Sequence, residues 1–177
     1  MQIGQLTITA PALGAPGSSI AQVIDSVAWM WMQAKMQGDL QVHDLSSMLL
    51  PALNEQQYIL ASAYVDGEIK PVAYLAWANM SAEAEQRYLR NRAATVEPAD
   101  WRSGDRMWIT EWFTPFGHAW QFRLVAGRLL AHRAARAIYH RVGAPGMRVL
   151  HFRGDTVTRA QARQWWSERP LLERHQK

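Results

Sequence analysis

Residues 57–80, QYILASAYVDGEIKPVAYLAWANM, decide the class of fold. Two apolar runs, 57–65 and 68–80, flank the dipeptide Asp66-Gly67. Asp-Gly between apolar runs is the strongest short-range signal for a β-hairpin, because both residues adopt positive φ readily. This stretch therefore predicts two antiparallel strands in the middle of the chain.

The sequence on either side of this hairpin predicts helices and further strands. Apolar residues at three- and four-residue spacing after Ser19, a residue that can cap a helix, predict the first helix. The predicted helices are 19–34, 44–53, 81–92, 158–168 and a long basic helix over 119–141, and the further strands are 105–113 and 147–153. Helices mixed with strands that look antiparallel predict an α+β (mixed α/β) fold.

The chain length of 177 residues predicts one domain. Residues 9–19, TAPALGAPGSS, are rich in Ala, Pro, Gly and Ser, and predict a loose segment. We therefore expect a flexible N-terminal lead over 1–18, one domain over 19–170 and a tail over 171–177.

The composition excludes several classes of protein. Apolar residues make up 49% of the chain and charged residues 19%, which is typical of a globular protein and not of a disordered one. The absence of Cys excludes disulfides, a thiolate nucleophile and a Cys-built zinc site, and we expect no metal. The apolar stretch 72–80 is too short to span a bilayer, and the first 34 residues contain no Lys or Arg. We expect a cytoplasmic protein.

Charge is distributed unevenly along the chain. Residues 1–120 carry 7 basic and 12 acidic side chains, a net charge of −5, whereas residues 121–177 carry 12 and 3, a net charge of +9. A basic third attracts anionic partners, such as an acidic carrier protein, the phosphates of acyl-CoA, or nucleic acid. Without a zinc-finger spacing or an RNA-binding aromatic signature, nucleic acid is not the expected partner. The alternative is that the arginines bind no partner and only form the solvent-exposed face of a helix.

Tryptophan is concentrated in a few segments. They are Trp29-Met30-Trp31, Ala76-Trp77-Ala78-Asn79, residues 100–106 (DWRSGDR), residues 108–112 (WITEW), and Pro115-Phe116-Gly117-His118. Aromatic side chains of this kind pack a core or a dimer contact, or they line a groove for a long apolar ligand. The sequence leaves both interpretations open.

Three titratable residues are candidates for catalysis. Glu111 lies within an apolar, aromatic strand, where burial raises a carboxyl pKa towards the range useful for proton transfer unless an Arg pairs with it. We expect Glu111 to share a face of that strand with Met107 and Ile109. His118 follows a Pro-Phe-Gly turn, where it is either a catalytic acid or base or a histidine of a surface turn. His43 lies at the start of a predicted helix, where a structural role is expected.

These segments together resemble the toxin-activating lysine acyltransferases, which include the hemolysin-activating proteins. The resemblance covers about residues 23–157, and its most specific part is residues 100–117, DWRSGDRMWITEWFTPFG. It implies a fold similar to the N-acetyltransferase (GNAT) type. It also implies transfer of a long-chain fatty acyl group from acyl carrier protein, or acyl-CoA, to a lysine-like amine in a protein or peptide.

The resemblance also implies roles for particular residues. It places catalysis at Glu111 and Gln37, with His118 or His43 assisting. It places substrate binding, with an acyl groove lined by the aromatic segments, at Trp29, Trp31, Trp77, Asn79, Trp112 and Phe116. The basic third implies contacts to the carrier protein through Arg128, Arg136 and Arg148.

Two of these positions depart from the family's pattern. Gln37 stands where the family has a catalytic His, and Glu111 stands where it has an Asp. A lysine amine has a pKa of about 10.4 and must lose a proton before it attacks. Glu can accept that proton, whereas Gln can only orient the amine or donate to an oxyanion. The sequence therefore predicts an acyltransferase with an altered site, and as the alternative a non-catalytic protein that binds an acyl chain or acyl carrier protein.

Overall fold

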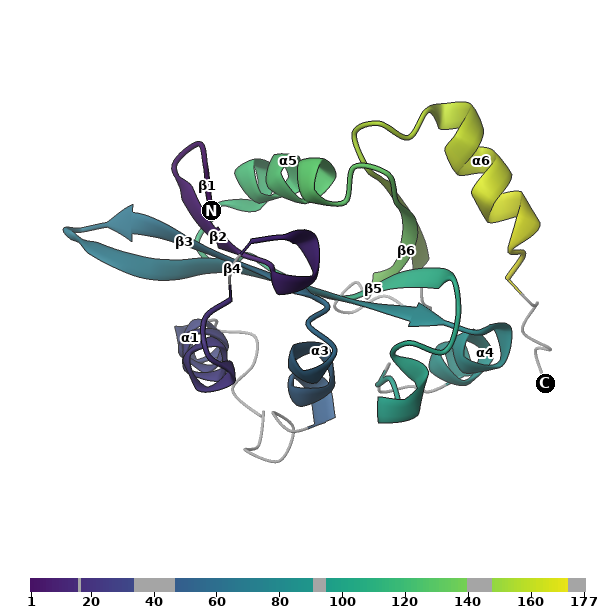
Figure 1. The fold of residues 1–177 in the computed structure, drawn as a ribbon, viewed down its shortest axis with the longest axis horizontal. Helices are drawn as coiled ribbons and strands as arrows, with labels where there is room; N and C mark the ends of the chain where they lie inside the picture. The colour runs from purple at the N-terminus through teal and green to yellow at the C-terminus, as the bar shows by residue number, and fades with distance from the viewer. Residues whose placement is uncertain (16, 34–46, 91–94, 140–147, 172–177) are drawn as a thin grey trace.

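The computed structural model describes residues 1–15, 17–33, 47–90, 95–139 and 148–171. Its centre is a seven-stranded sheet in the order β1 to β7, in which only β5 and β6 are parallel (Figure 1). The strands are β1 (Gln2–Ile3), β2 (Leu6–Thr9), β3 (Tyr58–Val65), β4 (Glu68–Met80), β5 (Arg106–Phe113), β6 (Ala134–Tyr139) and β7 (Arg148–Arg153). Parallel neighbours need a crossover connection, which a helix between β5 and β6 provides.

The predicted hairpin is confirmed. Strands β3 and β4 pair from Tyr58 opposite Ala76 to Val65 opposite Glu68. At the turn, Asp66 has φ of 52° and Gly67 has φ of 83°. Two successive positive φ values match the right-handed twist of the strands, and Asp-Gly reaches this conformation at little cost.

Helices cover both faces of the sheet. Two capping boxes, at Ser19 with Gln22 and at Thr158 with Gln161, start the first and last of them. One face carries α1 (Ile20–Gln33), α3 (Leu50–Asn54) and α4 (Ala82–Arg90), and the other carries α5 (Ala119–Leu129) and α6 (Arg159–Glu168) (Figure 1). This single mixed α+β domain is consistent with the GNAT-type fold.

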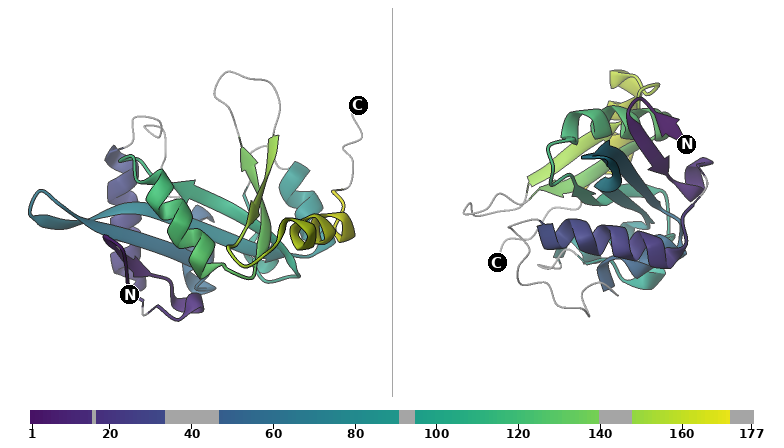
Figure 2. Two further views of the ribbon diagram at one scale, coloured as in Figure 1. Left: turned by 90° about the horizontal axis from the view of Figure 1, so that it is seen from above. Right: turned by 90° about the vertical axis from the view of Figure 1, so that its left-hand side faces the viewer.

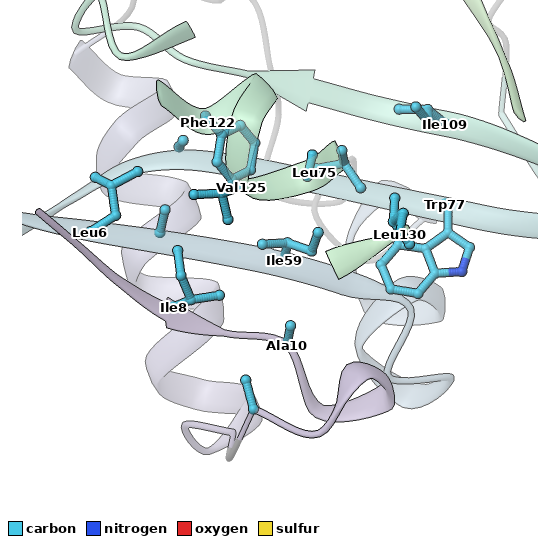
Figure 3. Packing of buried hydrophobic residues seen from close by; sticks show 14 of the residues in the cluster. Leu6, Ile8, Ala10, Ile59, Leu75, Trp77, Ile109, Phe122, Val125 and Leu130 are labelled. Atoms are coloured by element: carbon cyan, nitrogen blue, oxygen red, sulfur yellow. The ribbon is translucent and has the colours of Figure 1, made fainter. Parts of the chain in front are cut away.

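The sheet therefore separates two apolar cores. The α5-side core joins β-strand residues such as Ile8, Ile59 and Leu75 to Phe122 and Val125 of α5 (Figure 3). The α1-side core is rich in aromatic residues: its members include Trp31, Tyr58, Tyr74, Tyr88 and Trp108. A residue's position in the strand alternation thus decides which of two chemically different surroundings it enters.

The long basic helix predicted over 119–141 is wrong. The helix α5 ends at Leu129, and Ala134–Tyr139 form β6, which pairs with β5 on one side and with β7 on the other. Ala and Arg favour helix in isolation, but pairing with two strands and burial of Ala134 and Ala135 override that local preference.

The flexible lead expected over 1–18 also differs from the structure. Residues Leu6–Thr9 form β2, which pairs with β3, and Leu6 and Ile8 are buried in the α5-side core. A short 3₁₀ helix, η1 (Pro11–Leu13), follows. Sheet pairing and burial thus tie the N-terminal segment to the domain. Of the expected tail, Leu171 packs against the α1-side core, and 172–177 lie outside the described residues.

The parallel contact between β5 and β6 is short. Only two residue pairs join them, Trp108 with Arg136 and Ile109 with Ala137. The hairpin of β6 and β7 is steeply inclined to the long strands β3 and β4 (Figure 2). The second half of β5, which contains Glu111, therefore continues beyond its last partner on β6.

A buried ionic cluster secures this junction. Glu85 of α4 accepts hydrogen bonds from the Trp108 indole at 2.8 Å, from Arg136 at 3.0 Å and from Arg106 at 2.5 Å. Arg136 also donates to the carbonyl oxygens of Trp166 and Arg169 at the end of α6. One carboxylate thereby connects α4, β5, β6 and, through Arg136, α6.

Candidate active site

Glu111 lies in a row of residues that crosses three strands. In this row Tyr58 on β3 is opposite Ala76 on β4, and Ala76 is opposite Glu111 on β5. Tyr58 and Ala76 belong to the α1-side core. Since directly opposed residues in an antiparallel pair project to the same face, Glu111 faces the α1-side core too.

A β-bulge in β5 produces this orientation, and it corrects the predicted alternation. Ala76 pairs with Glu111, but the next residue, Trp77, pairs with Ile109, so Thr110 is the extra residue. Met107 and Ile109 therefore pack in the α5-side core while Glu111 faces the opposite way. A single inserted residue reverses the face of every residue after it.

The Glu111 side chain is partly buried, and no charge compensates its carboxyl. Within the described part of the chain, no cation and no hydrogen-bond donor is paired with it. Loss of hydration raises the pKa of Glu111 from 4.5 to about 7. A carboxyl with this pKa exchanges its proton near neutral pH, as a general base must.

The charge of Glu111 affects the pKa values of two tyrosines in the α1-side core. Burial, and then the charge of Glu111, raises the pKa of Tyr74 well above its ordinary value and also raises that of Tyr88. The ring of Tyr88 also packs edge-on against Trp108, with 5.5 Å between ring centres. Sequence reasoning missed both tyrosines. The two-residue step from Tyr74 to Ala76 places these two residues on one face of β4, the face that Glu111 shares.

The helix α1 meets the turn that follows β5. The rings of Trp29 and Phe116 lie 5.4 Å apart, and Trp31 is buried in the α1-side core. The structure thus brings three of the expected acyl-groove residues, Trp29, Trp31 and Phe116, to the face that carries Glu111. The expected catalytic Gln37, and His43, lie outside the described residues.

Two other expected groove residues face the wrong way for that role. Trp77 packs in the α5-side core, and Trp112 packs against it, with its ring 5.3 Å from Phe122. The bulge at Thr110 explains Trp112, because it exchanges the faces of Glu111 and Trp112. The aromatic segments therefore divide between the two faces of the sheet.

Asn79 has a hydrogen-bonding role at the other end of β5. Its side-chain amide donates to Gln57 Oε1 at 2.7 Å, and Gln57 in turn donates to the carbonyls of Trp77 and Trp101. Asn79 also lines a cleft of about 440 Å³ with Gly104, where the Met80 carbonyl leaves no room for a Cβ. This network shapes the loop that precedes β5.

His118 lies away from Glu111. It lines a cleft of about 650 Å³ between the β1–β2 turn and α5, on the face opposite to Glu111. Its Nδ1 is buried and has no hydrogen-bond partner in the described structure. The structure does not bring the predicted assistant and the predicted base together.

The three arginines expected to contact a carrier protein have different surroundings. Arg128, which lines the same cleft as His118, and Arg148, at the start of β7, are exposed. Arg136 is only 2% exposed, and Glu85 and the end of α6 hold its guanidinium. The surface role expected for Arg136 does not fit this burial, and sequence reasoning missed its partner Glu85.

A family model for RTX toxin acyltransferases (HlyC) matches residues 18–153. The chain belongs to this family. A protein-lysine myristoyltransferase of Kingella kingae is 31% identical over 134 residues, 76% of this chain and 77% of the relative. A leukotoxin-activating lysine-acyltransferase of Aggregatibacter actinomycetemcomitans is 30% identical over 80% of this chain and 81% of its own length. A protein-lysine myristoyltransferase of Escherichia coli is 35% identical over 54% of each chain.

This membership confirms two expectations from the sequence, the resemblance itself and the enzyme class of N-acyltransferase. Among the residues that the structure describes, no helix is long and apolar enough to cross a membrane. In the same ranges, no group of three or more His, Asp or Glu side chains is arranged to hold a metal ion.

Proposed function

We propose that this protein transfers a long-chain fatty acyl group from the thioester of acyl carrier protein to a lysine-like amine of a protein or peptide. The observation that carries the proposal is the unpaired carboxyl of Glu111, whose pKa of about 7 suits it to take a proton from the amine. One relative is named as a protein-lysine myristoyltransferase and another as a leukotoxin-activating lysine-acyltransferase. Both names support a protein lysine as the acceptor.

The reaction needs one proton transfer to Glu111 and one from it. The ammonium first loses one proton to solvent, and Glu111 removes a second proton from the nitrogen as it attacks the thioester carbon. The C–S bond then breaks as the amide forms, and the proton held by Glu111 returns to the sulfur of the leaving thiol. Gln37 is the residue proposed to orient the amine through its side-chain amide, which can donate and accept hydrogen bonds but cannot carry the proton.

The donor is proposed from charge. The net charge of +9 in residues 121–177 suits an acidic carrier protein, and the exposed Arg128 and Arg148 are available for such a contact. Acyl-CoA carries phosphates and is the other donor to test. The cytoplasmic location expected from the sequence remains a prediction, and so does a homodimer formed through the aromatic segments.

Intact mass spectrometry tests this function. The purified protein is mixed with long-chain acyl carrier protein or acyl-CoA and with lysine-containing peptides, and we expect a peptide mass gain of one acyl group. Replacing the base, Glu111→Gln, is expected to slow transfer by about 10²–10⁴-fold. Glu68→Gln, an exposed carboxylate at the hairpin turn, is the matched control and retains the wild-type rate.

The other outcomes separate the alternatives. A stable complex with the carrier protein without transfer supports the non-catalytic accessory protein, and Gln37→His then creates little activity. Transfer that persists at the wild-type rate in Glu111→Gln shows that another group is the base.

A further inference from the structure

The hydroxyl of Tyr74 is a buried hydrogen-bond donor without an acceptor. The residue is 1% exposed, and its Oη has no hydrogen-bond partner in the described structure. Trp108, on the same face, differs from it, because its indole N–H donates to Glu85 at 2.8 Å. A buried polar group left unpaired lowers stability, so its retention calls for a functional reason.

Strand register places Tyr74 near the candidate base. Tyr74 is opposite Phe113, and Ala76, two residues further along β4, is opposite Glu111. Tyr74 and Glu111 are therefore diagonal neighbours on one face, a separation that an aromatic and a long side chain can bridge. Ala76, which lies between them in the pattern, has only a methyl group and leaves the space above it to its larger neighbours.

Packing fixes the position of the Tyr74 ring. It stacks on the ring of Tyr58, with 6.3 Å between centres and an angle of 24° between planes. A donor that is already held in place loses little freedom when its acceptor arrives, which is the property of an effective oxyanion site.

We propose that Tyr74 donates its hydroxyl hydrogen bond to the carbonyl oxygen of the acyl thioester as that oxygen becomes negatively charged. This role rests on the proposed acyl transfer. The amine nitrogen bonds to the carbonyl carbon, the π electrons of the C=O move to oxygen, and Tyr74 stabilises the resulting oxyanion. When the C=O re-forms, the C–S bond breaks, and the thiolate takes the proton held by Glu111.

The surroundings of Tyr74 suit a donor that keeps its proton. Burial and the neighbouring charge of Glu111 hold the pKa of its phenol well above the ordinary value. The hydroxyl therefore stays protonated while Glu111 alternates between its two forms near pH 7. The two groups thus perform different tasks at one site.

The substitution Tyr74→Phe separates catalysis from stability. Loss of an oxyanion donor is expected to lower kcat by about 10²–10³-fold with little change in KM. The melting temperature is expected to stay equal or to rise, since phenylalanine keeps the ring and removes an unpaired buried hydroxyl. A tyrosine that only fills the core would keep its activity in this variant.

Tyr58→Phe is the matched control. Tyr58 is equally buried and stacks on Tyr74, but its hydroxyl lies beside Gly17, and the pKa of Tyr58 is raised by burial alone, without a contribution from Glu111. We expect its kcat to stay within about threefold of the wild type.

Steady-state transfer rates and thermal melting of the three proteins decide the question. An active wild type with a slow but stable Tyr74→Phe variant supports the oxyanion role. An active wild type with an equally active Tyr74→Phe variant overturns that role and leaves the proposed function intact. A wild type that transfers nothing from either donor overturns the proposed function and the role of Tyr74 with it.

Discussion

Glu85 and Glu111 are two acidic residues on the same side of the sheet, one buried and one partly buried, and their surroundings are opposite. Two arginines and an indole N–H satisfy the oxygens of Glu85, which is 2% exposed. Glu111 has no such partner among the described residues, and its pKa is raised to about 7. The same residue type is thus fully paired at one place and unpaired at the other.

The number of partners distinguishes an acid that holds the fold together from one that is free to react. A carboxylate that is fully paired holds elements together but has no free lone pair for a substrate. A carboxylate kept unpaired costs stability and retains its chemistry. The three predictions below test this contrast.

The largest expected effect on stability is that of Glu85→Gln. It leaves Arg106 and Arg136 without their shared carboxylate, in a site where Arg136 is 2% exposed. Breaking a buried pair in this way costs about 3–5 kcal/mol. Urea denaturation measures the free energy of unfolding, with Glu68→Gln at the exposed hairpin expected to change it by less than about 0.5 kcal/mol. Equal stability of the two variants would mean that the cluster around Glu85 does not secure the junction.

The variant Glu111→Gln is expected to change stability in the opposite direction. Because its folded-state pKa is raised, the folded protein binds this proton more tightly than the unfolded chain. The stability contributed by the bound proton is present below about pH 4.5 and is lost as the pH rises to about 7. At pH 8 the variant, which carries no charge here, should be more stable than the wild type by on the order of 2 kcal/mol. Denaturation at pH 5 and pH 8 measures the difference, and a variant less stable at pH 8 would contradict it.

Asp100 is intermediate between the two glutamates in the number of arginines that pair with it. It is 6% exposed, and a single arginine, the half-exposed Arg87, pairs with both of its oxygens. Since water reaches Arg87, the variant Asp100→Asn should lower the melting temperature by less than half as much as Glu85→Gln. If Asp100→Asn lowered the melting temperature more than Glu85→Gln does, the number of paired arginines would not determine how much each acid stabilises the fold.

Local signals in the sequence predicted the elements whose cause is local. Asp66-Gly67 specifies its own turn, and Ser19 and Thr158 cap the helices that follow them. The strand β6 was missed because residues 134–139 become a strand only when β5 and β7 flank them. Such pairing joins residues far apart in the chain, which local preference does not encode.

The candidate site was predicted only in part, because some of its features depend on strand pairing and not on local sequence. Glu111 stood out as an acid in an apolar strand, and in the structure loss of hydration raises its pKa to about 7. The face that it occupies depends on the bulge at Thr110, which appears only in the pairing with Ala76 and Trp77. The burial of Arg136 likewise depends on Glu85, 51 positions earlier in the chain.

The short contact between β5 and β6 has a consequence for how the molecule opens. Only two ladder pairs join β6 to β5, whereas eight register pairs join β3 to β4. Segments with few shared hydrogen bonds open cooperatively at a lower free energy than the rest. Under native conditions the backbone amides of β6 and β7 should therefore exchange with deuterium together and ahead of those in β3 and β4. The C-terminal part would then behave as a separate unit of local unfolding, hinged where β5 ends its pairing.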